Sequence, residues 1–180
     1  AYNNYGCIIV ASSGYGYADG NTNFYYHPPS GLNNVISVSA TLSGDNVGCW
    51  ATAGTTVDLC SSGENITSTS LVDGYDAAGG TSCSSPSTVG AVALVWSKFP
   101  IESQEWVVDR IITTTDEFAD MDGSCNAGSL EGMLGSGRLN INKALSAGIF
   151  PSLSIIDVNY QNDDDGDGVF NPGEQVKVKI

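Results

Sequence analysis

Positive charge is scarce in this chain. Six Lys and Arg stand against 20 Asp and Glu in 180 residues, which gives a formal net charge of −14. Nucleic acids and anionic membranes bind proteins through cationic side chains that neutralise phosphate groups. Neither is therefore expected as a partner, and no apolar run approaches the roughly 18 residues that span a bilayer. With charged residues at only 14% of the chain, coiled coils and long exposed helices are also disfavoured.

Histidine and metal-binding cysteine pairs are also scarce. There is one His, and the five Cys form no CxxC pair, so a structural zinc site is not expected. An odd number of cysteines leaves at least one unpaired within the chain. Cys49 and Cys60 lie 11 residues apart and either bridge a loop or are both reduced and buried. What is abundant is glycine (22 residues) and hydrophobic side chains (41%), as in a folded, loop-rich, exported protein.

The order of apolar and helical segments predicts an α/β fold. Strands followed by helices favour a parallel sheet, whose strands are buried on both faces. The sequence also stops within an alternating segment at 175–180, which suggests a fragment of a longer protein. We expect strands at 7–10, 35–40 and, as short pieces with a turn, 50–59; a Ser/Gly-rich stretch up to 85; helices at 85–98, 102–113 and 141–146; and an acidic loop at 116–137.

The segment Gly79–Pro86 (GGTSCSSP) leads into the strongest predicted helix. A serine at a helix N-terminus lies beside unpaired N–H groups and the positive end of the helix dipole, which stabilise a developing oxyanion. Pro86 is compatible with the first helical turn because its missing N–H is not needed there. A simpler interpretation is that Ser82 or Ser84 only caps the helix.

The sequence from Gly80 to Pro100 (GTSCSSPSTVGAVALVWSKFP) resembles the nucleophile block of the subtilisin-like serine proteases, the subtilases. The apolar CIIVASSG, the segment NVISVSAT and the closing GSGRLN are similar to further blocks of that family, so that the resemblance covers about residues 7–147. It implies a partial three-layer domain with a parallel sheet, formed by the C-terminal part of a catalytic domain at 1–150.

The resemblance also implies roles for individual residues. Ser82 is the expected nucleophile, and its backbone N–H is one donor to the oxyanion. The family places an Asn after the strand's glycine as the other donor, but this chain has Tyr15 there, with Asn21 as an alternative donor. The expected wall of the substrate pocket is formed by Ala11, Ser12, Ser13 and Gly14.

Two members of the family's catalytic triad are missing from this sequence. The family's Asp and His blocks lie upstream of the first apolar strand, and the single histidine, His27, is not in such a block. A serine without a general base is a weak nucleophile. We therefore expect a secreted serine endopeptidase acting on polypeptides, whose upstream part supplies Asp and His, with the isolated chain inactive. The alternative is an inactive subtilase-like protein with a calcium-dependent binding or structural role.

The C-terminal segment carries a pattern typical of a calcium loop. Asp163, Asp165, Asp167 and Glu174 have the D-x-D-x-D-G-x₅-E spacing, in which alternating carboxylates converge on one hard cation and Val169 supplies a backbone oxygen. The alternating flanks, however, are typical of strands. The segment resembles the start of Ig-like β-sandwich modules of secreted bacterial proteins, so residues 151–180 are expected to begin such a module. A solvated acidic hairpin is the other interpretation.

Overall fold

The structure is a computed structural model that describes residues 2–15, 28–71, 73–117, 130 and 132–146. The chain divides into two compact units, Ala1–Ala147 and Gly148–Ile180. The second unit lies outside the described residues, so the domain boundary near 150, the β-sandwich module and the calcium loop remain predictions. None of the described helices is both long and apolar enough to cross a membrane.

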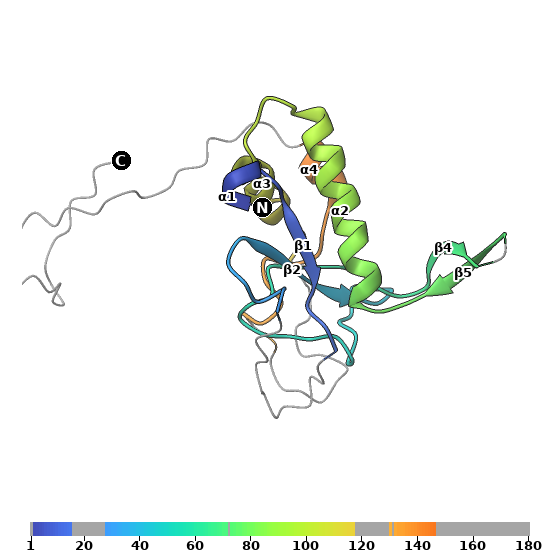
Figure 1. The fold of residues 1–180 in the computed structure, drawn as a ribbon. Helices are drawn as coiled ribbons and strands as arrows, with labels where there is room; N and C mark the ends of the chain where they lie inside the picture. The colour runs from blue at the N-terminus through green and yellow to red at the C-terminus, as the bar shows by residue number, and fades with distance from the viewer. Residues whose placement is uncertain (1, 16–27, 72, 118–129, 131, 147–180) are drawn as a thin grey trace, which may run out of the picture. The chain divides into compact units, whose positions relative to one another are not determined.

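A three-stranded parallel sheet forms the centre of the first unit (Figure 1). Its order is β1 (Ile9–Ser12), β2 (Val35–Thr41) and β3 (Leu59–Ser62). The register pairs Ile9 with Val35 and Val38 with Leu59. The predicted α/β class with a parallel sheet is therefore confirmed. Since parallel strands all point the same way, the chain leaves each strand at the same edge of the sheet.

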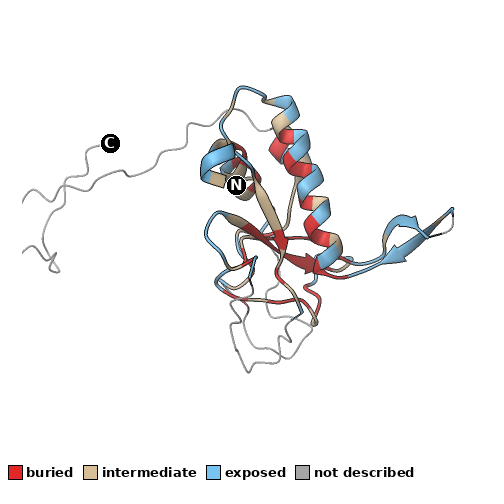
Figure 2. Ribbon diagram, viewed as in Figure 1, coloured by how far each residue is buried: buried red, intermediate tan, exposed pale blue. Residues whose placement is uncertain are grey.

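Helices α2 (Thr81–Lys98), α3 (Gln104–Thr113) and α4 (Ile141–Ser146) bury one face of the sheet. Figure 2 shows buried and exposed residues alternating along α2, because only one side of that helix contacts the sheet. Burial of this apolar surface is the main term that holds sheet and helices together. The buried core consists of Ile36, Val38, Leu59, Ala91, Val92, Val95, Val107, Ile111 and Ala144.

Two helices largely agree with the sequence prediction. α4 begins and ends as predicted, and α3 begins two residues later than expected, because the Ser103 hydroxyl accepts the Trp106 N–H and caps it. α2 instead begins at Thr81 rather than at Ser85, which makes Pro86 its sixth residue. The prediction that Pro86 belongs to the first turn was wrong, since the helix starts directly after the glycine pair.

The region between β2 and α2 differs most from the prediction. Short strands were expected at 50–59, but this segment contains turns and a single bridge from Ala51 to Tyr15, and β3 begins only at Leu59. The Ser/Gly-rich stretch contains an antiparallel hairpin of β4 (Ile66–Ser70) and β5 (Gly74–Ala78) that extends away from the sheet (Figure 1). A short helix, α1 (Tyr2–Tyr5), precedes β1.

Four of the five cysteines lie among the described residues: Cys7, Cys49, Cys60 and Cys83. Cys49 is disulfide-bonded, whereas Cys60 is a buried free thiol, so these two residues do not bridge each other. Burial raises the pKa of the Cys60 thiol to about 12, which keeps it protonated and unreactive at neutral pH. Cys7 and Cys83 are also free.

An ionic network joins the last described segment to the helices. The backbones of Asp116 and Arg138 exchange two hydrogen bonds of 2.8 Å. The Asp116 carboxylate accepts from Arg138 at 2.9 Å and from Asn140 at 2.8 Å, and it pairs with Lys143 at 2.5 Å. These donors, led by Lys143, lower the pKa of Asp116. The carboxylate thus fixes the segment that runs beside β3.

Replacing Asp116 with Asn is expected to flatten the acid side of the stability profile. A carboxylate whose folded-state pKa is lowered contributes stability above its unfolded pKa, and that contribution is lost as pH falls through the folded value. Because the Asp116 carboxylate is only partly shielded from water, we expect the Asn variant to lose about 1 kcal/mol of unfolding free energy at pH 7. This loss should become smaller towards pH 2. Urea unfolding at both pH values measures it. Asp76→Asn, on the exposed hairpin, is the control. Equal losses of unfolding free energy in the two variants would contradict a stabilising role for the Asp116 carboxylate.

Candidate active site

The start of α2 is shaped by two glycines. Gly80 is the N-cap with φ 124°, a conformation that side-chain-bearing residues rarely adopt. Its N–H donates to the Gly63 carbonyl at 2.8 Å, and its own carbonyl accepts from Cys83 N and Ser84 N at 2.9 and 3.3 Å. A Cβ on Gly79 would come within 3.0 Å of the Gly63 oxygen. The chain therefore turns tightly from β5 into the helix, with no side chain in the way.

Ser82 is the second residue of α2 and is exposed. No side chain caps the helix, so the interpretation of Ser82 or Ser84 as the cap was wrong. The N–H of the second helical residue has no acceptor within a regular helix, so the Ser82 N–H and the positive end of the dipole are available to an incoming group. Pro86 also lacks the N–H that would bond the Ser82 carbonyl in a regular helix.

The end of β1 lies against this helix start. Thr81 Oγ1 is 3.3 Å from both the amide nitrogen and the carbonyl oxygen of Gly14, and accepts from the first while donating to the second. The Gly14 carbonyl also accepts from Thr52 N at 3.3 Å. Thr81 is 1% exposed and Gly14 is half-buried, so this contact is largely shielded from water. The structure thus places the Gly14–Tyr15 bend beside the residue that precedes Ser82, a role for Thr81 that its place in the GTS motif alone did not identify.

Ser84 fixes the helix to the end of β3. Its buried hydroxyl lies 3.0 Å from the Ser61 carbonyl and 3.2 Å from that of Ser62. Space here is tight, because a Cβ on Gly63 would approach both the Ala40 Cβ and the Ser84 Oγ to 2.6 Å. The position of the exposed Ser82 is therefore set by two buried hydroxyls, one on each side of it in the sequence.

Ser84→Ala is expected to destabilise the fold by about 1–2 kcal/mol, because buried carbonyls at the end of β3 lose their hydroxyl partner. Ser87→Ala is the matched control, since the Ser87 hydroxyl bonds only the Cys83 carbonyl within the same helix, at 3.0 Å. That variant should be within about 0.5 kcal/mol of the parent chain. Urea unfolding compares the two, and equal losses would show that the contact with β3 contributes nothing.

The expected substrate wall and oxyanion residues lie at the same edge of the sheet. Ala11 and Ser13 are buried at 9% and 2% exposure, while Ser12 and Gly14 are half-buried. Tyr15 is 71% exposed, and its ring lies 5.6 Å from that of Trp50, centroid to centroid. Asn21, His27 and the predicted calcium-loop residues at 163–174 lie outside the described residues.

The described residues do not contain a complete catalytic triad. They include no histidine, and no hydrogen bond from Ser82 to a carboxylate or other base is present there. They also contain no group of three side chains suited to hold a metal. Cys83, which directly follows Ser82, is a half-buried free thiol. What the described part provides is an exposed serine on a helix N-terminus, positioned against the end of a neighbouring strand.

Comparison with known proteins identifies the family. Residues 1–167 match the Subtilase family, Peptidase_S8, and the chain belongs to this family. It is 30% identical over 115 residues to subtilisin DY from Bacillus licheniformis, covering 64% of this chain and 42% of that protein. It is 32% identical over 129 residues to an extracellular protease from Xanthomonas campestris pv. campestris, covering 67% of this chain and 21% of that protein. The chain thus spans less than half the length of these curated relatives.

Solved structures agree at the level of the fold. The prenylagaramide maturation protease PagA superposes with a TM-score of 0.64 and 20% identity over 78% of this chain and 50% of its own. The epidermin leader peptide processing serine protease EpiP from Staphylococcus aureus superposes with a TM-score of 0.63 and 19% identity. The match covers 81% of this chain and 42% of that one. The α/β unit is therefore similar in fold to part of these proteases.

Proposed function

We propose that this chain is the C-terminal part of a secreted serine endopeptidase that cleaves polypeptides through an acyl-enzyme. The observation that supports this most directly is the pair of contacts between Thr81 and Gly14, which brings the exposed Ser82 next to the strand expected to line the substrate. Secretion is proposed because relatives such as the one from Xanthomonas are named extracellular proteases.

In this proposal the Ser82 hydroxyl attacks the scissile carbonyl while a histidine takes its proton. The tetrahedral oxyanion accepts a hydrogen bond from the Ser82 N–H at the head of α2. When the intermediate collapses, the histidine protonates the leaving amine, and water later hydrolyses the acyl-enzyme by the same route in reverse. Tyr15, or a neighbour such as Asn21, is proposed as the second oxyanion donor; removal of one such donor typically costs about 10²–10³ in kcat.

The missing histidine and aspartate are proposed to come from the upstream part of the same protein. Two features of the described residues support a polypeptide neighbour there. β1 pairs only with β2 among these residues, which leaves its other backbone edge open. α2 also has an exposed, largely apolar stripe at helical spacing, formed by Pro86, Val89, Gly90, Ala93, Leu94 and Ser97. Both are typical of surfaces that a further layer of the domain covers.

Fluorophosphonate labelling of the complete protein tests the proposal, because the reagent modifies a serine only when its hydroxyl is activated by a base. Label at Ser82 is expected. The competing hypothesis is a non-catalytic subtilase-like protein that binds calcium-dependently, and the observation that favours it is Tyr15 at the family's asparagine position. A folded complete protein that takes no label and cleaves no peptide would reject the enzyme hypothesis.

We also propose a calcium site formed by Asp163, Asp165, Asp167, the Val169 carbonyl and Glu174, on the strength of their spacing alone. Calcium binding to the chain should be measurable by calorimetry. Asp165→Ala should weaken it at least tenfold, since one of about six oxygen ligands is lost. Asp76→Ala, which leaves the acidic loop intact, serves as the control. Absence of binding heat in the parent chain would contradict the site.

A further inference from the structure

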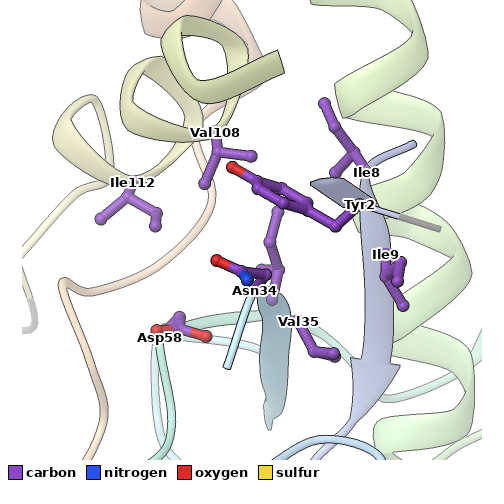
Figure 3. A pocket seen from close by; sticks show the side chains of 9 residues that line it. Tyr2, Ile8, Ile9, Asn34, Val35, Asp58, Val108 and Ile112 are labelled. Carbon is purple, nitrogen blue, oxygen red and sulfur yellow. The ribbon is translucent and has the colours of Figure 1, made fainter. Parts of the chain in front are cut away.

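A small pocket lies at the opposite end of the strands from Ser82. It has a volume of about 190 Å³ and opens where β1 and β2 begin (Figure 3). Ser82 and Gly14 lie where the strands end. α1 and α3 supply the pocket's other walls. Its lining residues are therefore separate from the residues proposed for proteolysis.

The walls of the pocket are mostly aliphatic. They are formed by Ile8, Ile9, Val35, Ile36, Val108 and Ile112. Such a surface gains free energy when it loses contact with water, at about 25 cal/mol per Å². A ligand with a short hydrocarbon body therefore suits most of the lining.

Three polar side chains complete the lining: Asp58, Asn34 and Tyr2. Figure 3 shows their polar ends around the space that Val108 and Ile112 bound from the other side. Asn34 has φ 63°, a left-handed conformation that fixes its position at the start of β2. Polar atoms concentrated at one part of an apolar pocket orient a ligand that has one polar end.

Asp58 lacks a counter-ion in the described part of the chain. One carboxylate oxygen accepts the Ser37 N–H at 2.7 Å, and no basic side chain there pairs with this group, since the ion pairs involve Arg138 and Lys143. Burial raises the pKa of Asp58, and the Ser37 N–H opposes this rise. A half-buried carboxylate with one hydrogen bond is stabilised by an incoming cation with N–H donors.

The surroundings of the pocket are also negative. Burial raises the pKa of the Tyr2 phenol, and the charges of Glu105 and Asp109 on α3 raise it further. These two carboxylates are therefore close enough to act on the Tyr2 end of the pocket. They favour a cation at this site over an anion or a neutral molecule.

We propose that this pocket binds a primary alkylammonium group, with the ammonium on Asp58 and the hydrocarbon chain against the aliphatic walls. The same chemistry occurs in a free aliphatic amine and in a lysine side chain of a polypeptide. The side chains of the lining offer a single carboxylate, one amide and one phenol. A hard divalent metal would have to draw most of its six or more oxygen ligands from backbone carbonyls and water.

Titration of the 180-residue chain with n-hexylammonium, followed by NMR chemical shifts of residues around the pocket, tests the proposal. Hexanol has the same hydrocarbon body without the charge and should bind at least about tenfold more weakly. Asp58→Asn keeps the acceptor for the Ser37 N–H and should weaken hexylammonium by a similar factor. Asp76→Asn, an exposed acid on the hairpin, should leave binding unchanged.

A second variant separates binding from folding. Val108→Phe fills the pocket without altering Asp58 and should abolish the hexylammonium shifts while the other resonances stay in place. Nα-acetyl-lysine methylamide distinguishes the sources: binding comparable to hexylammonium indicates a polypeptide lysine, and binding of hexylammonium alone indicates a free amine. Equal binding of hexanol and hexylammonium, or full binding by folded Asp58→Asn, overturns the proposal.

Discussion

Ser82→Ala is expected to abolish peptide hydrolysis and fluorophosphonate labelling by the complete protein while leaving its unfolding midpoint almost unchanged. The hydroxyl is exposed, so its removal breaks no buried contact. In contrast, no other group is expected to replace the hydroxyl as nucleophile. In subtilisin, a member of the family to which this chain belongs, loss of the nucleophile lowers kcat by about 10⁶. The measurements are kcat with a peptide substrate and mass spectrometry of the labelled peptide.

The neighbouring thiol provides the control for this result. Cys83 is free, half-buried and adjacent in sequence, so it is the nucleophile most easily confused with Ser82. Cys83→Ala should retain labelling and at least about a tenth of the activity, since it removes no group assigned to the chemistry. If Ser82→Ala still takes the label, or if Cys83→Ala alone loses it, the assignment of the nucleophile is wrong.

Gly135→Ala is expected to destabilise the chain by about 2–4 kcal/mol. A Cβ at this position would lie 2.1 Å from the Asp58 carbonyl carbon and 2.2 Å from its oxygen. These are backbone atoms at the start of β3, so they cannot rotate away as a side chain would. Overpacking of this kind costs about 1–3 kcal/mol or more, and the left-handed φ of 64° adds about 1 kcal/mol for a residue with a Cβ.

Gly132→Ala is the matched control for this clash. Gly132 has nearly the same backbone angle, φ 72°, but a Cβ there would meet nothing within 4 Å. It should therefore lose only the conformational term of about 1 kcal/mol. Urea unfolding of both variants isolates the steric term as their difference. A difference below about 1 kcal/mol would show that the 135–137 segment can move away from β3 at little cost.

The sequence by itself determined the features that depend on local pattern. The apolar run 35–40 forms β2, which has one additional residue, and residues 141–146 form α4 as predicted. Both predictions succeed because the spacing of apolar residues and the turn residues are properties of a few neighbouring positions. The GTSCSSP block also identified the family, and residues 1–167 match it. The roles of Ser82, Tyr15 and residues 11–14 follow from that block and remain proposals.

Local pattern was insufficient where neighbours distant in sequence set the conformation. α2 extends back to Thr81 because Gly63 and Ser61 supply partners for Gly80 and Ser84, and neither contact is visible in the helix's own residues. The Ser/Gly-rich segment before it pairs as β4 and β5 despite weak apolar alternation, since its cross-strand hydrogen bonds do not require a buried face.

Tertiary structure alone decided which residues meet. The contact of Thr81 with Gly14 joins positions 67 apart, and the Asp58 pocket combines α1, β1, β2 and α3. Hydrogen bonds and burial depend on distance in space, whereas a sequence gives only order along the chain. The sequence therefore determined the candidate nucleophile and the elements around it, and the packing of the sheet against its helices decided what lies beside that nucleophile.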